Sequence, residues 1–233
     1  MRLALIADVH SNLPALEAVL REVDARGVDE IACLGDVVGY GAEAQACVDV
    51  VRARCALVVR GNHDEAVATG TTAGLPKDGV VAALHNREHL DADALAWLAG
   101  LPLVEIVDEA VTLVHATPQT PERWLRADSF QVVHAQFGFF ATPVCVAGHQ
   151  HMPAVTGERV GQLRVRPGGR FFVVAGSVGQ PRDGNPRAAV SFYDTEKMQY
   201  EIVRVPYNVD TAAQRILDAG LPLALARRLK IGQ

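Results

Sequence analysis

The sequence predicts an α/β fold with two β-sheets, formed as one domain over residues 1–233. Three observations predict it. Apolar strand-like runs alternate with helix-like segments over residues 2–59, an order typical of a parallel sheet covered by helices. Beyond residue 154, strand-like runs follow one another at short spacing, which favours an antiparallel or mixed second sheet. With 49% hydrophobic and 21% charged residues, the chain can bury the core that such a fold requires.

The amino-terminal segment carries the βαβαβ alternation. A buried strand is expected at residues 2–7, followed by a helix at 14–25. Asn12 suits the position that caps this helix, and Pro14 suits its first turn. The alternation continues with a strand at 30–34, a helix at 43–54 and a strand at 56–59.

The middle of the chain is less regular. Two apolar runs at 103–107 and 110–115 predict a hairpin, because Asp108 and Glu109 separate them. His134 lies in a helix-like patch at 128–138 and is interpreted as structural. The other predicted elements are helices at 65–69, 80–88, 91–99, 210–219 and 222–230, a loop at 69–79, and strands at 142–147, 154–166, 170–175, 188–194 and 199–205.

Composition excludes several classes of protein. A net charge of −5 and a pI of about 5.9 indicate neither a general nucleic-acid surface nor a membrane surface. No run approaches the ~18 apolar residues of a membrane span, and the apolar start is too short for a signal peptide, so a cytoplasmic protein is expected. The four cysteines form no CxxC pair and are expected to be buried reduced thiols.

Side chains suited to chemistry gather at five places, each at or just beyond a predicted strand end. The carboxyl ends of parallel strands form the crevice where open α/β sheets bind ligands. Residues two apart on extended backbone point to the same side, so Asp8 and His10 can face one point, and His149 and His151 can repeat that arrangement. Any one of these places alone could be an ordinary turn. The five places are Asp8-Val9-His10, Gly35-Asp36, Gly61-Asn62-His63-Asp64, His115 and Gly148-His149-Gln150-His151.

In this order, the motifs D-x-H, G-D, G-N-H-D, H and G-H-x-H resemble those of the calcineurin-like metallophosphoesterase superfamily, over roughly residues 3–152. The stretch GSVGQPRDGNPRA at 176–188 is similar to a small prokaryotic branch of YfcE-like phosphodiesterases. The resemblance implies a two-sheet mixed β-sandwich flanked by helices, with two divalent metal ions bound at the edge of the sheets. It also implies hydrolysis of a phosphoric ester by a hydroxide that bridges the metals.

The resemblance further implies a role for each motif residue. Asp36 would bridge the two ions, and His63 would be the general acid that protonates the leaving group. Asp64 either orients His63 or caps the helix that follows. Imidazole, carboxylate and amide ligands without thiolate suit Mn, Fe, Zn or Ni, and Mn is the expected metal. The first ion would be held by Asp8, His10, Asp36 and His151, and the second by Asp36, Asn62, His115 and His149.

Two arginines are candidates for substrate binding. Arg182 and Arg187 lie on the loop QPRDGNPR, where guanidinium groups could hold a phosphate in bidentate fashion. The alternative is a solvated loop in which these arginines pair with Asp183. Both interpretations remain open at this point.

Aromatic residues and one departure from the family pattern also bear on the substrate. Tyr40, Trp124 and Phe137 could stack a nucleotide base, although Trp124 also suits packing in the core or at the rim. The segment GDVVGYG has Gly39 and Tyr40 where the protein Ser/Thr phosphatases of the superfamily carry an Asp-Arg pair. This argues against a protein phosphatase of that type.

These features favour a metal-dependent phosphodiesterase acting on a small phosphorylated or nucleotide-like substrate. A phosphomonoesterase (including one acting on phosphoprotein) and a dinucleoside polyphosphate hydrolase are alternatives within the enzymes. A non-catalytic metal-binding scaffold is the alternative from another class. A Rossmann-type nucleotide binder is excluded, because DVHSN follows the first strand where that fold requires GxGxxG. Assembly into a homo-oligomer is left open.

Overall fold

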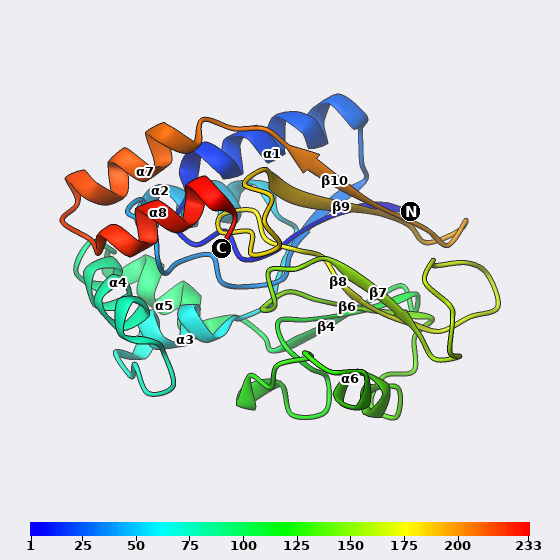
Figure 1. Ribbon diagram of the computed structural model, residues 1–233. Helices are drawn as coiled ribbons and strands as arrows, with labels where there is room; N and C mark the ends of the chain where they lie inside the picture. The colour runs from blue at the N-terminus through cyan, green and yellow to red at the C-terminus, as the bar shows by residue number, and fades with distance from the viewer.

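The computed structural model describes residues 1–233 and contains two five-stranded mixed sheets packed face to face, with helices on their outer sides (Figure 1). The first sheet has the strand order β10-β9-β1-β2-β3, and the second has the order β4-β5-β6-β8-β7. The predicted fold class, an α/β two-sheet sandwich flanked by helices, is therefore confirmed.

The first sheet contains the predicted parallel alternation. β1 pairs with β2 and β2 pairs with β3, both in parallel. The side-chain oxygen of Asn12 accepts a hydrogen bond from the Ala15 amide at 3.2 Å, so Asn12 caps α1 as expected. The elements of this segment are β1 (Arg2–Ile6), α1 (Leu13–Arg26), β2 (Glu30–Cys33), α2 (Ala44–Arg54) and β3 (Leu57–Val58).

The second sheet begins with the predicted hairpin, in which β4 and β5 are antiparallel. β6 then pairs in parallel with both β5 and β8. Its strands are β4 (Val104–Val107), β5 (Val111–Val114), β6 (Val144–Ala147), β7 (Ala154–Gly157) and β8 (Phe171–Val174).

Two predictions about the carboxyl-terminal strands are wrong. β9 (Ala188–Asp194) and β10 (Gln199–Val205) do not extend the second sheet, because β9 pairs antiparallel with β1 and β10 pairs with β9 in the first sheet. The strand expected at 154–166 ends at Gly157, whose amide donates to the Gln162 carbonyl at 2.9 Å and turns the chain back. An apolar pattern predicts a strand but not its partner, since pairing depends on distant residues.

The helices cover the outer faces of the sandwich. α1 and α2 pack on the outer face of the first sheet, and α6 packs on the outer face of the second. None of the helices has the length and apolar character needed to cross a membrane. The remaining helices are α3 (Asn62–Thr69), α4 (Lys77–Glu88), α5 (Ala92–Gly100), the 3-10 turn η1 (Pro121–Arg123), α6 (Phe130–Gln136), α7 (Val209–Asp218) and α8 (Leu223–Ile231).

The side chains of β1 alternate between the helix layer and the second sheet. Ala4 and Ile6 face the helices, whereas Leu3 and Leu5 face the second sheet, where they meet side chains such as Phe171. All four β1 side chains are fully buried. The strand is therefore held on both faces, and the residues that follow it start from a rigid base.

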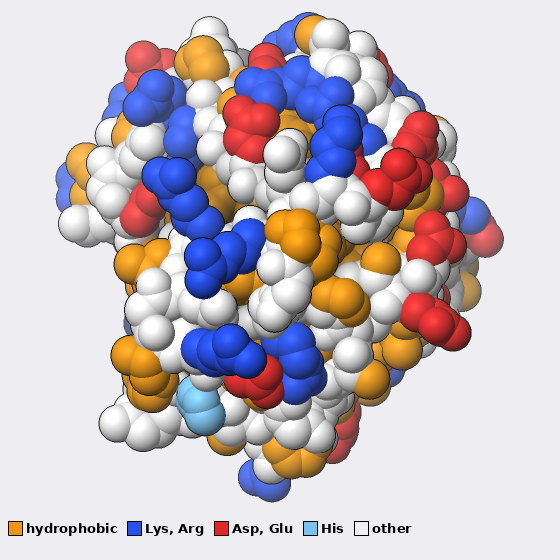
Figure 2. All heavy atoms as spheres, turned by 90° about the vertical axis from the view of Figure 1, so that its right-hand side faces the viewer, with side chains coloured by type: hydrophobic (Ala, Val, Ile, Leu, Met, Phe, Trp, Pro, Cys, Tyr) orange, Lys and Arg blue, Asp and Glu red, His pale blue; other side chains and the backbone are white.

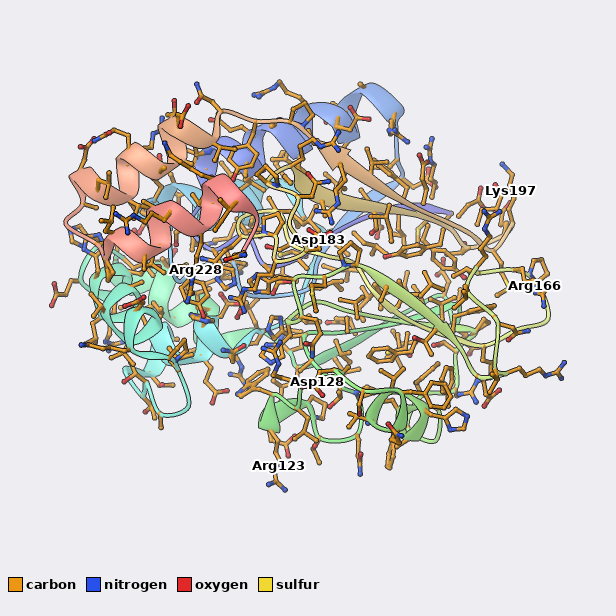
Figure 3. The ribbon with its side chains drawn as sticks, viewed as in Figure 1. Arg123, Asp128, Arg166, Asp183, Lys197 and Arg228 are labelled. Atoms are coloured by element: carbon orange, nitrogen blue, oxygen red, sulfur yellow. The ribbon has the colours of Figure 1, made fainter.

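The end of the sandwich that carries Arg166 and Lys197 is rich in basic side chains (Figures 2 and 3). Acidic and apolar side chains interrupt these basic groups on the same face (Figure 2). The four cysteines form no disulfide, and all are buried except the half-buried Cys55, which agrees with the expected reduced thiols.

Candidate metal centre

The motif residues predicted as metal ligands converge where strands of both sheets end. Asp8 and Asp36 follow β1 and β2, Asn62 begins α3 just after β3, and His115 directly follows β5. Five of the seven side chains are almost fully buried, whereas Asn62 and His149 are partly exposed. The structure thus brings together all seven residues: Asp8, His10, Asp36, Asn62, His115, His149 and His151.

Backbone conformation sets these residues apart. Five of the seven have a left-handed backbone, a conformation that is uncommon for residues other than glycine and costs of order 1 kcal/mol or more each. Such strain persists only where the surrounding structure enforces it, and it concentrates at functional sites. The five and their φ values are Asp8 at 54°, His10 at 48°, Asp36 at 52°, His149 at 65° and His151 at 59°.

Asp36 lies at the centre of the arrangement. Its Oδ2 is 3.3 Å from His115 Nε2 and 3.6 Å from His10 Nε2. Its Oδ1 accepts a hydrogen bond from the His63 amide at 2.8 Å, which fixes the carboxylate plane. One oxygen therefore faces two imidazoles from different strands, as a carboxylate shared by two metal ions would.

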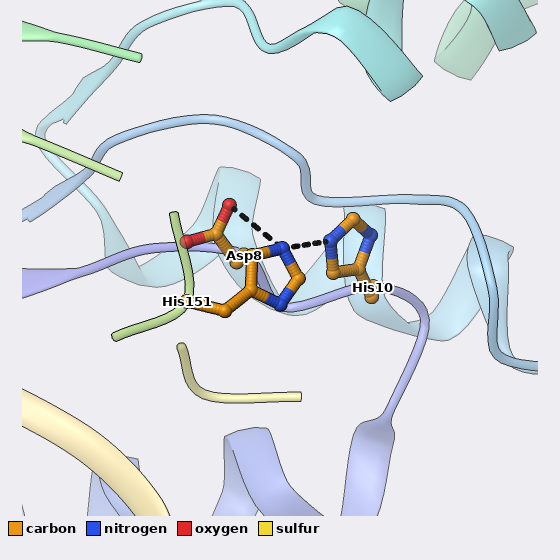
Figure 4. A group of neighbouring side chains, drawn as sticks. All are labelled: Asp8, His10 and His151. Carbon is orange, nitrogen blue, oxygen red and sulfur yellow. Dashed lines mark hydrogen bonds and ion pairs between the residues drawn. The ribbon is translucent and has the colours of Figure 1, made fainter. Parts of the chain in front are cut away.

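The first cluster contains Asp8, His10 and His151 (Figure 4). His10 Nδ1 donates to the Val38 carbonyl at 3.0 Å, and His151 Nδ1 donates to the Gln180 carbonyl at 2.6 Å. A carbonyl oxygen only accepts, so each Nδ1 carries the proton and each Nε2 presents a lone pair to the centre.

The donor set of this cluster fits a cation. Burial holds the pKa of both His10 and His151 well below the usual value, so both rings are neutral near pH 7. Their Nε2 atoms nevertheless lie 3.1 Å apart, with two lone pairs facing each other, and Asp8 Oδ1 is 3.6 Å from His151 Nε2. The second oxygen, Asp8 Oδ2, is buried without a hydrogen-bond partner. A metal ion would satisfy all of these groups.

The second cluster contains Asp36, His115 and His149, with Asn62 beside it. His115 Nδ1 donates to the Leu34 carbonyl at 2.7 Å, and His115 Nε2 lies 3.1 Å from Asn62 Oδ1. Burial acts to lower the pKa of His115, but the charge of Asp36 and its hydrogen bond outweigh burial and raise that pKa to about 9. The position between Asp36 and Asn62 therefore attracts positive charge, which a metal ion could supply instead of the proton.

His63 lies beside both clusters rather than apart from them. Its ring packs edge-on against His10 at a centroid distance of 4.9 Å and tilts against Tyr40 at 4.4 Å. Its Nδ1 is buried without a hydrogen-bond partner. Ligand atoms of His10, Asp36 and His63 also form a third grouping, so geometry alone admits His63 as either a ligand or a proton donor.

Asp64 connects the loop after β2 to the start of α3. Its carboxylate accepts hydrogen bonds from the amides of Asp36 at 2.8 Å, Val38 at 3.2 Å and Gly61 at 3.0 Å. Of its two predicted roles, the structure shows capping, but from the third residue of α3, because Gly61 occupies the N-cap position where Asp64 was expected. This cap also explains why α3 begins at Asn62, three residues before the predicted start. A side chain at Gly61 could not fit, because its Cβ would lie 2.2 Å from Asp36 Oδ1.

A cleft of about 690 Å³ opens above these residues. Asp36, Asn62, His63, His149 and His151 form its floor. Sequence reasoning predicted Trp124 as a candidate at the rim but missed Arg123, Arg126 and the loop 71–76, since none of these has a strand-end motif that would mark it. Their position in the cleft results from folding alone.

Of the two candidate arginines, only Arg182 lies at the cleft. Its Nε and Nη2 donate to Gln180 Oε1 at 3.3 and 2.8 Å, and its guanidinium lies over the Tyr40 ring at 5.5 Å. Arg187 does not line the cleft, and its Nε donates to Asn185 Oδ1 at 3.2 Å. Asp183 pairs with Arg204 instead of with either candidate.

The aromatic candidates differ in their surroundings. Phe137 is 6% exposed and lies in the apolar cluster beneath α6, so the expectation that it could stack a base is wrong. Tyr40 lines the cleft but is only 4% exposed, because His10, His63 and Arg182 pack around its ring. Trp124 lies at the rim, edge-on to His115. His134 donates to the Glu158 carbonyl, outside the site.

We expect the metal-free protein to lose stability as the pH falls below 6.5. Burial lowers the pKa of His63 to about 4 and that of His149 to about 3, and holds those of His10 and His151 well below the usual value. These four imidazoles take up protons near pH 6.5 only when the chain unfolds. Acid therefore stabilises the unfolded state relative to the folded state.

Two buried carboxyls act in the opposite direction. Burial raises the pKa of Asp8 and of Asp64 to about 7, so both hold a proton in the folded state between about pH 4 and pH 7. The four imidazoles outnumber the two carboxyls by two. The free energy of unfolding should therefore fall by on the order of 2 kcal/mol per pH unit between pH 6.5 and pH 5. Urea unfolding in EDTA at both pH values checks this. Equal or greater stability at pH 5 would contradict it.

Comparisons with known proteins extend these observations. The sequence model of the calcineurin-like phosphoesterase superfamily domain matches residues 1–198. An uncharacterised protein of Methanocaldococcus jannaschii is 36% identical, over 99% of this chain and 98% of its own length.

Two solved structures share the whole architecture. A metallophosphoesterase from Sphaerobacter thermophilus superposes with a TM-score of 0.88 at 35% identity and covers 100% of both chains. A hypothetical protein from Pyrococcus horikoshii superposes with a TM-score of 0.83, covering 100% of this chain and 98% of its own. At 18% identity the second match supports the fold alone.

Proposed function

The chain belongs to the calcineurin-like phosphoesterase superfamily, as its motifs predicted, and on that premise we propose that it is a metal-dependent phosphodiesterase. Its substrates would be small nucleotide-like phosphodiesters. One observation carries the proposal: neutral His10 and His151 present facing Nε2 lone pairs 3.1 Å apart, beside a carboxylate oxygen without a partner. Such an arrangement suits a cation that a phosphoester can then approach through the cleft.

The proposed cofactor is a pair of divalent ions, with Mn expected. When bound, the ions would act as Lewis acids on the phosphoryl oxygens and lower the pKa of a coordinated water from 15.7 to about 7. Asp36 would contribute to both ion sites through its Oδ2. The other ligands would be Asp8, His10 and His151 for one ion and Asn62, His115 and His149 for the other.

Arg182 is the proposed phosphate-binding residue of the chain. Gln180 holds one edge of its guanidinium, while the Gln180 carbonyl holds the ligand His151. The arginine is therefore fixed relative to the metal centre, and its remaining N–H groups can donate to a phosphoryl oxygen.

His63 is the proposed general acid. In the free protein, burial and the positive charges of His115 and Arg182 lower its pKa to about 4, although Asp36 acts to raise it. A bound phosphodiester adds a negative charge beside the ring, which favours the protonated imidazole. The ring can then donate that proton to the departing alkoxide.

A comparison of two chromogenic substrates tests the function. With added Mn, bis-p-nitrophenyl phosphate should be hydrolysed with a kcat/KM at least about tenfold above that of p-nitrophenyl phosphate, a difference of about 1.4 kcal/mol in transition-state binding. EDTA should abolish the activity, because the ions would hold and polarise the phosphoryl group.

The alternatives predict other outcomes. A preference for the monoester would favour a phosphomonoesterase. Release of nucleotide from a dinucleoside polyphosphate, without hydrolysis of the diester, would favour a dinucleoside polyphosphate hydrolase. Activity that survives chelation would refute the mechanism. A metal content far below two per chain after reconstitution, without turnover, would favour a non-catalytic scaffold. The cytoplasmic location and any homo-oligomeric state stay predictions.

A further inference from the structure

Two further arginines, Arg123 and Arg126, line the cleft from a part of the chain remote from Arg182. Arg126 follows η1, in the connection between β5 and β6 of the second sheet, whereas Arg182 lies on the loop before β9 of the first sheet. The cleft therefore has a guanidinium contributed by each sheet.

The segment that carries Arg126 is shaped by local backbone geometry. η1 spans Pro121–Arg123, and Trp124 then takes a left-handed conformation with φ of 53°. This reversal places the Trp124 ring edge-on to His115, at a centroid distance of 5.9 Å. The neighbouring Arg123 also lines the cleft, although its side chain extends away from the body of the molecule in Figure 3.

The charge of Arg126 is largely uncompensated. Its nearest carboxylate is that of Asp128, at 3.8 Å from Arg126 Nε, and both side chains are about half exposed, at 49% and 57%. Exposed pairs at this distance contribute little, about 0 to 1 kcal/mol. Apart from Asp36, the only carboxylate lining the cleft is that of Glu65, which pairs with Arg60 at 3.7 Å. No acidic side chain of the cleft is thus committed to Arg126.

The cleft offers more positive charge than the reacting group of one phosphodiester needs. A phosphodiester carries a single negative charge, which the metal centre and Arg182 already face. We propose that Arg126 binds a second, non-reacting phosphoryl group, so that the preferred substrates are phosphodiesters bearing an additional phosphate. A cleft of about 690 Å³ is within the range that holds ligands of nucleotide size. This inference rests on the proposed phosphodiesterase function and specifies its substrate.

The test uses the p-nitrophenyl ester of thymidine 5′-phosphate, with and without a 3′-phosphate, on the Mn-loaded protein. The form with the 3′-phosphate should have the lower KM. In Arg126→Gln, its KM should rise about tenfold to a hundredfold, as expected for losing hydrogen bonds between charged groups, with kcat little changed. The KM of the form without the 3′-phosphate should change less than about twofold, because no group of this substrate would reach Arg126.

Arg166→Gln is the control, because it removes the same charge from an exposed side chain that does not line the cleft. It should leave both KM values nearly unchanged. Metal content and melting temperature should match the wild type in both variants. Equal losses on the two substrates in Arg126→Gln, or no preference of the wild type for the 3′-phosphate, would overturn the inference and leave the phosphodiesterase function standing.

A failure of the proposed phosphodiesterase function can be distinguished from a failure of the inference about Arg126. If neither ester is hydrolysed, calorimetric titration with thymidine 3′,5′-bisphosphate still reports on Arg126. Weaker binding of this bisphosphate by Arg126→Gln than by Arg166→Gln and the wild type would support the second phosphate site. Equal binding by all three proteins would refute it.

Discussion

Replacing Asp36 by Asn is expected to remove metal from both clusters and to lower kcat by at least about a thousandfold. Asp36 Oδ2 is the one carboxylate oxygen that faces imidazoles of both clusters, His10 and His115. An amide there supplies one neutral oxygen and an NH2 group that binds no cation. Lewis-acid stabilisation is worth several kcal/mol, and each 1.4 kcal/mol is a factor of ten in rate.

Metal content per chain, measured by mass spectrometry after reconstitution and desalting, is the direct readout for Asp36→Asn. The fold should survive, because an Asn oxygen can still accept the hydrogen bond of the His63 amide. Asp93→Asn is a suitable control, since that side chain is 78% exposed and pairs only with Arg52 at the surface. An Asp36→Asn protein that keeps two ions and half of its activity would exclude a bridging role.

Replacing His63 by Ala is expected to slow hydrolysis only where the leaving group needs a proton. For an ester of an unactivated alcohol, kcat should fall about a hundredfold to ten-thousandfold, the usual contribution of general acid catalysis. For bis-p-nitrophenyl phosphate the loss should be much smaller, because p-nitrophenolate departs as a stable anion. The ratio of the two losses measures proton donation.

Metal content decides between the two roles that the geometry admits for His63. If the imidazole donates a proton, His63→Ala keeps its full metal content. If it is a ligand, metal is lost and both substrates slow equally. His134→Ala is a matched control, because this exposed imidazole lies outside the site, where it contacts the Glu158 carbonyl and the rings of Phe130 and Phe137. Equal loss on both esters with full metal content would refute both roles.

Much of the fold and of the candidate site could be predicted because the signals are local. The strands β1, β2, β5 and β6 are short and mostly apolar runs, and each is followed within two residues by a polar or glycine residue. Parallel strands bring such ends to one edge, so the meeting of Asp8 and Asp36 follows from the pairing of β1 with β2. His149 reaches them from the second sheet, and left-handed backbone, not the extended alternation expected from the sequence, orients all three side chains.

Other features could not be predicted, because they depend on residues distant in the chain. Phe137 and Trp124 are both aromatic residues next to polar ones, yet one is buried beneath α6 and the other borders the cleft. Asp64 has a local capping signal, but its bonds to the amides of Asp36 and Val38 cross 28 and 26 residues. Arg126 has no sequence signal at all.

The sequence by itself determined which side chains stand at the ends of the strands, since apolar alternation and turn-forming residues act over a few neighbours. Tertiary structure alone decided that β9 and β10 join the first sheet, and that Arg126 and Arg182 reach the same cleft from different sheets. Those outcomes come from packing and strand pairing between remote segments, whose free energy no short stretch of sequence contains.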